Sequence, residues 1–179
     1  MICGNFLGDF IKNRELKLLP KEWLKGIELH RKIDTFTDTH NEVKKCTKLL
    51  HPTQGKYAPV VVDVFFDYVL YRNWSTYSAI SFPDFEDQIY AALLDHCDRF
   101  PLRLQSMTRS MVRDRFLRSY TSYEGLAYTF KRMKPRFKFK TNIDSAVSDL
   151  QRNYDDIEAS FNRFFPEIIG VAESYCTTC

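Results

Sequence analysis

The chain has 179 residues, of which 44% are hydrophobic and 15% aromatic, and its formal net charge is +3. This composition predicts one globular domain over residues 1–179 and excludes a disordered chain. Six glycines disfavour a turn-rich sandwich or barrel. No apolar run approaches the roughly 20 residues that a membrane span needs, and the first residues lack the basic flank and apolar stretch of a signal peptide. We therefore expect a cytoplasmic protein.

The elements predicted for the first half of the chain are helices. Apolar spacing predicts helices over 5–13, 22–36 and 41–50, the last one stopped at Pro52. The segment 57–74 is the most apolar of the chain, and its valines would suit a buried strand. Its length favours a helix.

Helices also dominate the second half. They are expected over 81–99, 101–118, 123–133 and 144–165, and a last helix opens at Pro166. No alternating hairpin pattern with an Asn-Gly or Asp-Gly turn appears. We therefore predict an all-α, single-domain bundle of roughly seven to nine helices.

The apolar segment around residue 65 carries two charges, and both are aspartates. On a helix, Asp63 and Asp67 face the same way, with Cβ atoms roughly 5–6 Å apart. Two like charges at this separation within an apolar element cost free energy, unless a cation or hydrogen-bond donors compensate them. The alternatives are a pair of structural aspartates bonded to Arg or Tyr and, in our preferred interpretation, a metal site.

A second polar group lies on the helix expected over 22–36 and just beyond it. A helical wheel puts Leu29 on the core side and Lys32 on the water side. His30, Asp34 and Asp38 fall on a third arc, which belongs to neither of these sides. A histidine and carboxylates four residues apart suit a divalent metal. A satisfied surface His–Asp pair is the competing interpretation.

Asp9 is the third candidate, because it sits in the apolar string GNFLGDF. The alternative interpretation is that Asp9 is only a charged residue at the end of a helix. Oxygen-rich ligands with one histidine suit manganese, magnesium or ferrous iron better than structural zinc. Cys176 and Cys179 form a CxxC pair, but no second CxxC completes a zinc site, so a frayed tail is expected there.

The basic charge is concentrated in one segment. Residues 109–140 hold ten Lys or Arg against two acidic residues, which is a net charge of +8 in a chain of +3. Such asymmetry suggests an acidic partner or a phosphate-bearing ligand. In the run 131–140, basic residues alternate with aromatic ones. Three interpretations of this run stay open, in decreasing order of preference: a solvated face, a docking surface for an acidic partner, and a groove for single-stranded nucleic acid.

Several strings of the chain resemble one known family. The strings are GNFLGDFIK at 4–12, GIELHRKIDTFTD at 26–38, VVVDVFFDYVLYRNW at 60–74 and YDDIEASFNRFFPEI at 154–168, and the run 125–136 joins them. They are similar to the acyl carrier protein phosphodiesterases, and the similarity covers almost the whole chain. The family commonly carries a histidine where this chain has Tyr68.

The resemblance implies an all-helical variant of the HD phosphatase and phosphodiesterase superfamily. It implies a manganese-preferring enzyme that cleaves 4′-phosphopantetheine from the serine of holo-acyl carrier protein. The matching metal ligands are Asp9, His30, Asp34 and Asp63. The ion would act as a Lewis acid and as a source of hydroxide near pH 7.

The roles of the remaining candidates follow from their placement. We expect Asp67 to orient or deprotonate the attacking water, Arg31 to neutralise charge on the phosphate, and Asp38 to assist. The acidic acyl carrier protein would dock on the basic segment. The expected docking residues are Arg113, Lys131, Arg132, Lys134 and Arg136. The alternatives are a non-catalytic carrier-binding protein and, last, a single-strand-binding helical domain.

Overall fold

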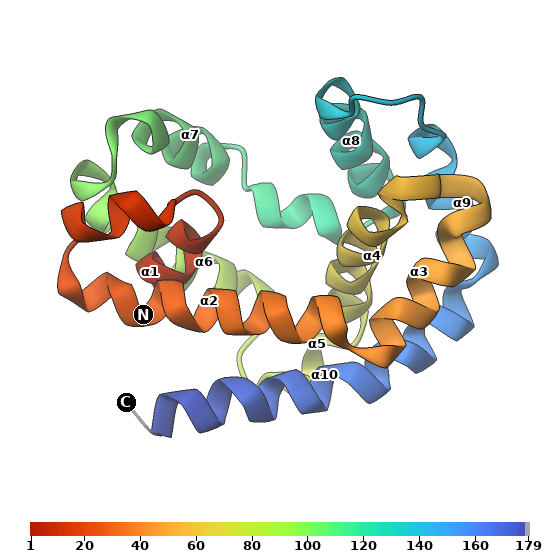
Figure 1. Cartoon of the computed structure of the whole chain (residues 1–179), viewed down its shortest axis with the longest axis horizontal. Coiled ribbons are helices and arrows are strands. Elements are labelled where there is room, and N and C mark those ends of the chain that lie inside the picture. Colours follow the sequence, from red (N-terminus) through yellow and green to blue (C-terminus); the bar gives the residue numbers. More distant parts are fainter. Residues whose placement is uncertain (178–179) are drawn as a thin grey trace. The chain divides into compact units, whose positions relative to one another are not determined.

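The computed structural model describes residues 1–177, and within that range it contains helices and turns but no strand (Figure 1). The α-helices are α1 (Ile2–Gly8), α2 (Lys21–Thr39), α3 (Asn41–Gln54), α4 (Ala58–Arg72), α5 (Trp74–Tyr77), α6 (Phe82–His96), α7 (Leu102–Arg113), α8 (Tyr123–Met133), α9 (Ala146–Arg152) and α10 (Tyr154–Thr177). Six short 3-10 turns join them, namely η1 (Asn13–Leu18), η2 (Gly55–Tyr57), η3 (Cys97–Arg99), η4 (Phe116–Tyr120), η5 (Lys134–Arg136) and η6 (Ile143–Ser145). The predicted all-α class is confirmed.

The chain forms two compact units, and each is built from separate stretches of sequence. Of the described residues, the first unit contains 1–38, 83–114 and 168–177, and the second contains 39–82 and 115–167. The units are therefore not two successive halves of the chain. One domain over 1–179 stays a prediction.

The first unit is centred on the crossing of α1 and α2. Its core includes Leu7, Trp23 and Ile27, all at most 2% exposed, together with residues of α6 and α7. At the crossing, a Cβ added to Gly4 would fall 2.9 Å from the Cα of Gly26, closer than real Cβ atoms approach other atoms. The two backbones therefore meet where neither helix has a side chain.

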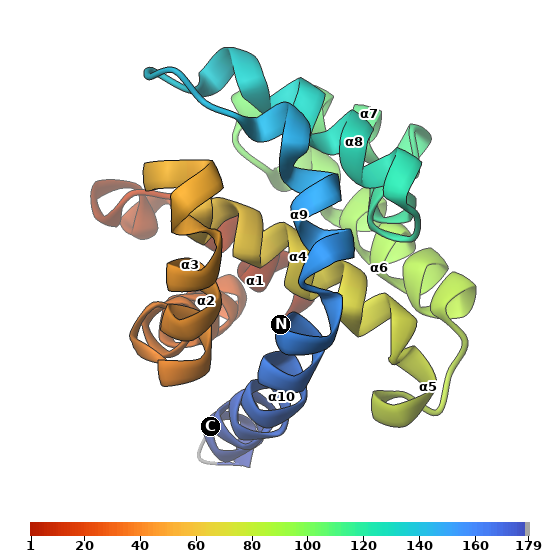
Figure 2. The ribbon, with the colours of Figure 1, turned by 90° about the vertical axis from the view of Figure 1, so that its right-hand side faces the viewer.

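The second unit is built around α4. This helix packs on α3 (Figure 2). Its Phe65 ring contacts that of Phe130 in α8, and its Phe66 ring contacts that of Phe161 in α10, at centroid distances of 5.9 and 5.4 Å. The strand alternative for 57–74 is excluded, because α4 is helical from Ala58 to Arg72. Packing of its wide apolar surface outweighs the strand preference of its valines.

Two prolines do not end helices where the sequence analysis placed the ends. Helix α3 continues through Pro52 to Gln54, and α10 continues through Pro166. Pro52 lies in the last turn, so the helix loses a single backbone hydrogen bond near its end. Both expected boundaries, at 50 and at 166, are wrong.

Two other predicted helices are interrupted. The helix expected over 101–118 ends at Arg113, because Arg115 adopts a left-handed conformation with φ 47° before η4. The helix expected over 144–165 breaks at Asn153, whose side-chain Nδ2 donates to the carbonyl of Asp149 at 2.8 Å. The predicted helix 123–133 matches α8 at both ends.

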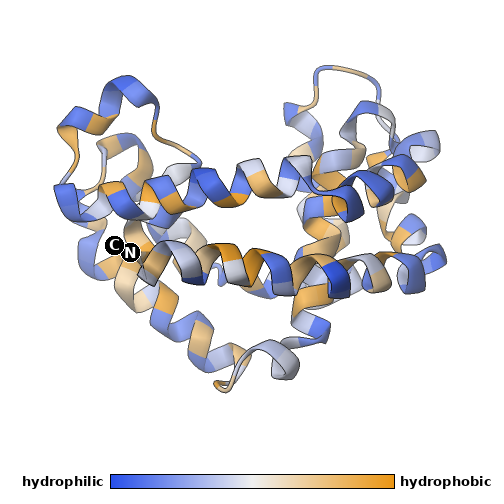
Figure 3. Cartoon of the chain, turned by 60° about the horizontal axis from the view of Figure 1, so that its bottom comes forward, coloured by the Kyte–Doolittle hydropathy of each residue, from blue (hydrophilic) through white to orange (hydrophobic). Residues whose placement is uncertain are grey.

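Polar and apolar residues alternate along the helices, as expected for helices with one buried face (Figure 3). Among the described residues, no helix combines the length and the apolarity that crossing a bilayer requires. Cys176 ends up exposed near the end of α10, and its CxxC partner Cys179 lies outside the described residues.

A buried polar contact ties the end of α3 to α9 in the second unit. Gln54 and Asp149 are each 2% exposed. The Nε2 group of Gln54 donates to Oδ2 of Asp149 at 2.6 Å and to the Ser145 hydroxyl at 3.2 Å. Arg152 donates to the other carboxylate oxygen at 3.0 Å. Because a buried carboxylate without donors is costly, this contact stabilises the unit.

We predict that Gln54→Ala lowers the free energy of unfolding by about 1–3 kcal/mol, since it removes a donor from a buried carboxylate. Urea denaturation measures the change. Gln151→Ala, at an exposed position of α9, is the matched control and should stay within about 0.5 kcal/mol of the parent. Equal effects of the two substitutions would show that the buried contact contributes nothing.

Candidate metal centre

Helix α2 presents the three faces that its sequence predicts. Leu29 is buried, and Lys32 is exposed. The His30 side chain is 14% exposed, and the Asp34 side chain, one turn later, is 56% exposed. The helix thus delivers an imidazole and a carboxylate to one edge of its buried face.

Asp9 joins this pair from the end of α1. It is the C-terminal cap of that helix, and its carboxylate lies 3.2 Å from Nε2 of His30. The Asp34 carboxylate lies 3.1 Å from the same nitrogen. One ligand atom from each of the three residues lies within 4.8 Å of the others. The structure therefore brings together three of the four residues predicted as metal ligands.

The imidazole nitrogen at the centre of this group is buried and poorly satisfied. Within residues 1–177, Nε2 of His30 makes no hydrogen bond of acceptable geometry, although both carboxylate oxygens lie at ion-pair distance. A buried polar atom without a hydrogen bond is unusual and costs free energy. A cation between the three groups would satisfy the nitrogen and both carboxylates at once.

The charges of the group act on each other. The adjoining Asp9 carboxylate raises the pKa of His30 above its usual range, partial burial opposes this rise, and Asp34 adds to it. Burial raises the pKa of Asp34, the neighbouring His30 opposes this rise, and the negative charges of Asp9 and Asp38 add to it. The carboxylates thus repel one another, and a positive charge near His30 relieves the repulsion.

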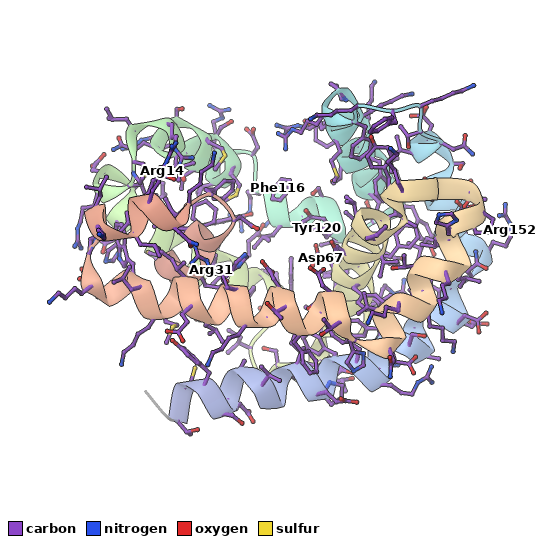
Figure 4. The ribbon with its side chains drawn as sticks, in the orientation of Figure 1. Arg14, Arg31, Asp67, Phe116, Tyr120 and Arg152 are labelled. Carbon is purple, nitrogen blue, oxygen red and sulfur yellow. The ribbon has the colours of Figure 1, made fainter. Side chains whose placement is uncertain are left out.

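Arg31 and the segment that follows Asp9 are joined by a hydrogen bond. The Nη2 group of Arg31 donates to the carbonyl of Ile11 at 3.1 Å, and Ile11 is only 5% exposed. This bond attaches the turn after Asp9 to α2, which is also the helix of His30. Arg31 projects from α2 in Figure 4. Its predicted contact with a phosphate stays a prediction.

The two aspartates of α4 belong to the second unit, and their surroundings differ from those expected. Asp63 and Asp67 are both exposed, while Val64, Phe65 and Phe66 are buried. The element that carries the two charges is apolar, as expected, but only on its buried side. The helix buries most of its circumference, and the two aspartates lie on its remaining polar stripe, from which Asp67 projects in Figure 4.

Asp67 nevertheless has an unusual acidity. Desolvation by surrounding atoms, and secondly the Asp63 carboxylate one turn earlier, raise its pKa to about 7. The Asp67 side chain also keeps contact with water, which screens such effects. A raised pKa is the property that a general base near neutral pH requires.

Tyr68, where the family commonly carries a histidine, is a core residue of the second unit. It is 3% exposed, and its ring lies 5.1 Å from that of Tyr123 and 6.3 Å from that of Tyr154. Burial raises the pKa of its hydroxyl, and a hydrogen bond with Tyr123 adds to the shift. This side chain packs inside the unit, whereas the aspartates of α4 are exposed.

The predicted docking residues divide between the units. Arg113 ends α7 in the first unit, where its guanidinium bonds to Asp114 at 3.0 Å and to the Ser110 hydroxyl at 2.9 Å. The other four lie in the second unit, at the end of α8 and in η5. All four are exposed, and Lys134 forms an ion pair with Asp144. The docking role of the five residues stays a prediction.

The sequence analysis missed the glycines that bring the two helices together. Gly4 and Gly8 are four residues apart in α1, and Gly26 and His30 are four residues apart in α2. Helical residues with this spacing lie on one face, so Gly4 and Gly8 leave one face of α1 without side chains, where another helix can approach closely. The spacing was visible in the sequence, but it does not say which two helices cross.

Comparisons with known proteins point to one family. The family model for acyl carrier protein phosphodiesterase matches residues 1–168. Relatives of that name from Serratia proteamaculans and Yersinia enterocolitica are 26% and 27% identical over 173 residues, which is 96% of this chain and 90% of each relative. One from Klebsiella pneumoniae is 28% identical over 176 residues, which is 96% of this chain and 89% of the relative.

No solved structure matches the chain. The family match covers residues 1–168, which extend over both units. The chain therefore belongs to the acyl carrier protein phosphodiesterase family.

Proposed function

We propose that this protein hydrolyses the phosphodiester that links 4′-phosphopantetheine to the serine of holo-acyl carrier protein and so releases apo-acyl carrier protein. The observation that carries the proposal is the group of Asp9, His30 and Asp34, whose ligand atoms lie within 4.8 Å of one another in a chain of this family. The proposed compartment is the cytoplasm. An HD-type placement of the fold is part of the proposal, supported by the all-helical structure and the His–Asp site.

The donor set suits a divalent ion that accepts both oxygen and nitrogen. Two carboxylates and one imidazole nitrogen fit Mn²⁺ best, and Mg²⁺ or Fe²⁺ are alternatives. Asp9, His30 and Asp34 would hold the ion, with Asp63 of α4 as the fourth proposed ligand. When bound, the ion supplies Lewis-acid chemistry to a phosphate oxygen.

The chain's own side chains supply the other steps of the proposed reaction. Asp67, with its raised pKa, accepts a proton from the attacking water. Arg31 offsets the negative charge that develops on the phosphate. Asp38, one turn after Asp34, contributes negative charge that holds the cation near α2.

The test is to incubate the protein with holo-acyl carrier protein and Mn²⁺ and to follow the mass of the carrier. We expect the carrier to lose its prosthetic group, and we expect Asp34→Asn to abolish most of the Mn²⁺ binding and the hydrolysis. Glu28→Gln, a matched carboxylate-to-amide change on an exposed face of α2, should leave both unchanged.

Three results would contradict the proposal. Carrier binding without loss of the prosthetic group would indicate a non-catalytic carrier-binding protein. Salt-sensitive binding of oligonucleotides, without action on the carrier, would indicate a single-strand-binding domain. Equal Mn²⁺ affinity in Asp34→Asn and the parent would remove the metal centre from its proposed place.

The raised pKa of Asp67 predicts a pH dependence of stability in the metal-free protein. The folded state holds the Asp67 proton more tightly than the unfolded chain does, so the stability from this group is present below pH of about 4 and is lost as the pH rises to about 7. Urea unfolding at several pH values measures the effect. Asp67→Asn should flatten the decline over this range.

Asp156→Asn, an exposed change on α10, controls for the loss of one negative charge. If the stability curves of the parent protein and Asp67→Asn run parallel between pH 4 and 7, the pKa of Asp67 is not raised in the fold.

The docking prediction concerns the basic end of α8. Acyl carrier proteins are strongly acidic, as the family resemblance implies, so basic residues should accelerate their association. Changing Lys131 and Arg132 to Glu should slow association with the carrier at low salt. The effect should shrink as salt rises, because the Debye length falls from about 10 Å at 0.1 M to about 3 Å at 1 M.

Stopped-flow measurement with apo-acyl carrier protein gives the association rate without interference from hydrolysis. Lys44 and Lys48, both exposed on α3 of the same unit, changed together to Glu, provide the control with the same change of charge. If both pairs slow association equally, net charge alone matters and α8 is no docking surface.

A further inference from the structure

Gly8 faces the ring of His30 with no side chain of its own. A Cβ added to Gly8 would fall 2.6 Å from the Cβ of His30 and still closer to ring atoms Cγ and Cδ2. Heavy atoms in van der Waals contact sit about 3.5–4.0 Å apart. The imidazole therefore occupies the space that any larger residue at position 8 would need.

The backbone at this position does not itself require glycine. Gly8 ends helix α1, and among the described residues the only glycine with positive φ is Gly55. Position 8 therefore requires glycine because there is no room for a side chain, and not because of its backbone conformation. This requirement differs from that at Gly4, where an added Cβ would meet the backbone of Trp23 and Gly26 rather than a side chain.

The position of the imidazole decides the geometry of the centre. With the ring in its present place, Nε2 lies 3.2 Å from Asp9 and 3.1 Å from Asp34. A methyl group on residue 8 would force α1 away from α2, because rotation of the ring about χ1 leaves the His30 Cβ, only 2.6 Å away, in place. This movement separates Nε2 of His30 from the Asp9 carboxylate, because Asp9 directly follows Gly8 on α1 while His30 lies on α2.

We propose that Gly8 is a positioning residue of the metal centre, whose missing side chain fixes the His30 ring between the carboxylates of Asp9 and Asp34. This role rests on the proposed function, since it assumes that the three residues bind a cation. Gly8 touches neither the ion nor the substrate and acts through His30 alone.

The first experiment measures Mn²⁺ affinity by the loss of the free-ion electron paramagnetic resonance signal. Gly8→Ala should weaken the affinity about 10- to 100-fold, the usual effect of disturbing groups that orient metal ligands. Circular dichroism should show the parent's helical content. Gly170→Ala, where an added Cβ meets nothing within 4 Å, controls for placing alanine in a helix and should keep the parent's affinity.

The second experiment is a double-mutant cycle on the metal-free protein, read as melting temperature. His30→Gly removes the side-chain atoms that an added Cβ would meet first. Gly8→Ala should therefore lower the melting temperature of the parent but have less than half that effect in the His30→Gly background. If Gly8→Ala alone does not fold, the double variant should fold.

The outcomes separate this inference from the proposed function. Absence of Mn²⁺ binding by the parent protein contradicts the metal centre itself. Parental Mn²⁺ affinity in Gly8→Ala, or an equal loss of melting temperature in both backgrounds, contradicts the positioning role of Gly8. Unfolding of both the single and the double variant also contradicts it, because Gly8 would then support the fold without acting through His30.

Discussion

The close crossing of α1 and α2 is the constraint on which the proposed centre depends. Gly4 and Gly26 let the two backbones meet without intervening side chains, and Gly8 leaves room for the imidazole of His30. Only because the helices approach this closely does Asp9, at the end of α1, reach a histidine 21 positions later in the chain. A wider crossing would leave His30 and Asp34 as an ordinary pair on the surface of one helix.

Electrostatics explains why such an arrangement suits a cation better than it suits the bare protein. One buried nitrogen faces two carboxylate oxygens at 3.1 and 3.2 Å without a hydrogen bond of acceptable geometry within residues 1–177. A third carboxylate, that of Asp38, adds to the negative charge around Asp34. Folding thus holds like charges together at a cost, and sites that bind metal ions commonly carry such a cost. The hydrogen bond from Arg31 to the carbonyl of Ile11 helps to keep Asp9 in place.

The sequence predicted features that depend on neighbours along a helix and failed where distant segments decide. The arc of His30 and Asp34 followed from helical periodicity, and α8 matched its predicted bounds, because both depend on local spacing. The exposure of Asp63 and Asp67 could not be read from the apolar residues around them, since it depends on which sides of α4 other helices cover. The positioning role proposed for Gly8 also needed the structure, because its neighbour His30 lies on another helix.

The most direct test of this account is a crystal structure of the protein with Mn²⁺, in which anomalous scattering locates the ion. We predict one strong anomalous peak within about 2.5 Å of His30 Nε2 and of one oxygen each of Asp9 and Asp34. The same map would show whether Asp63 completes the coordination. A peak elsewhere, with the three side chains unchanged and none of them bound to the ion, would contradict the central claim.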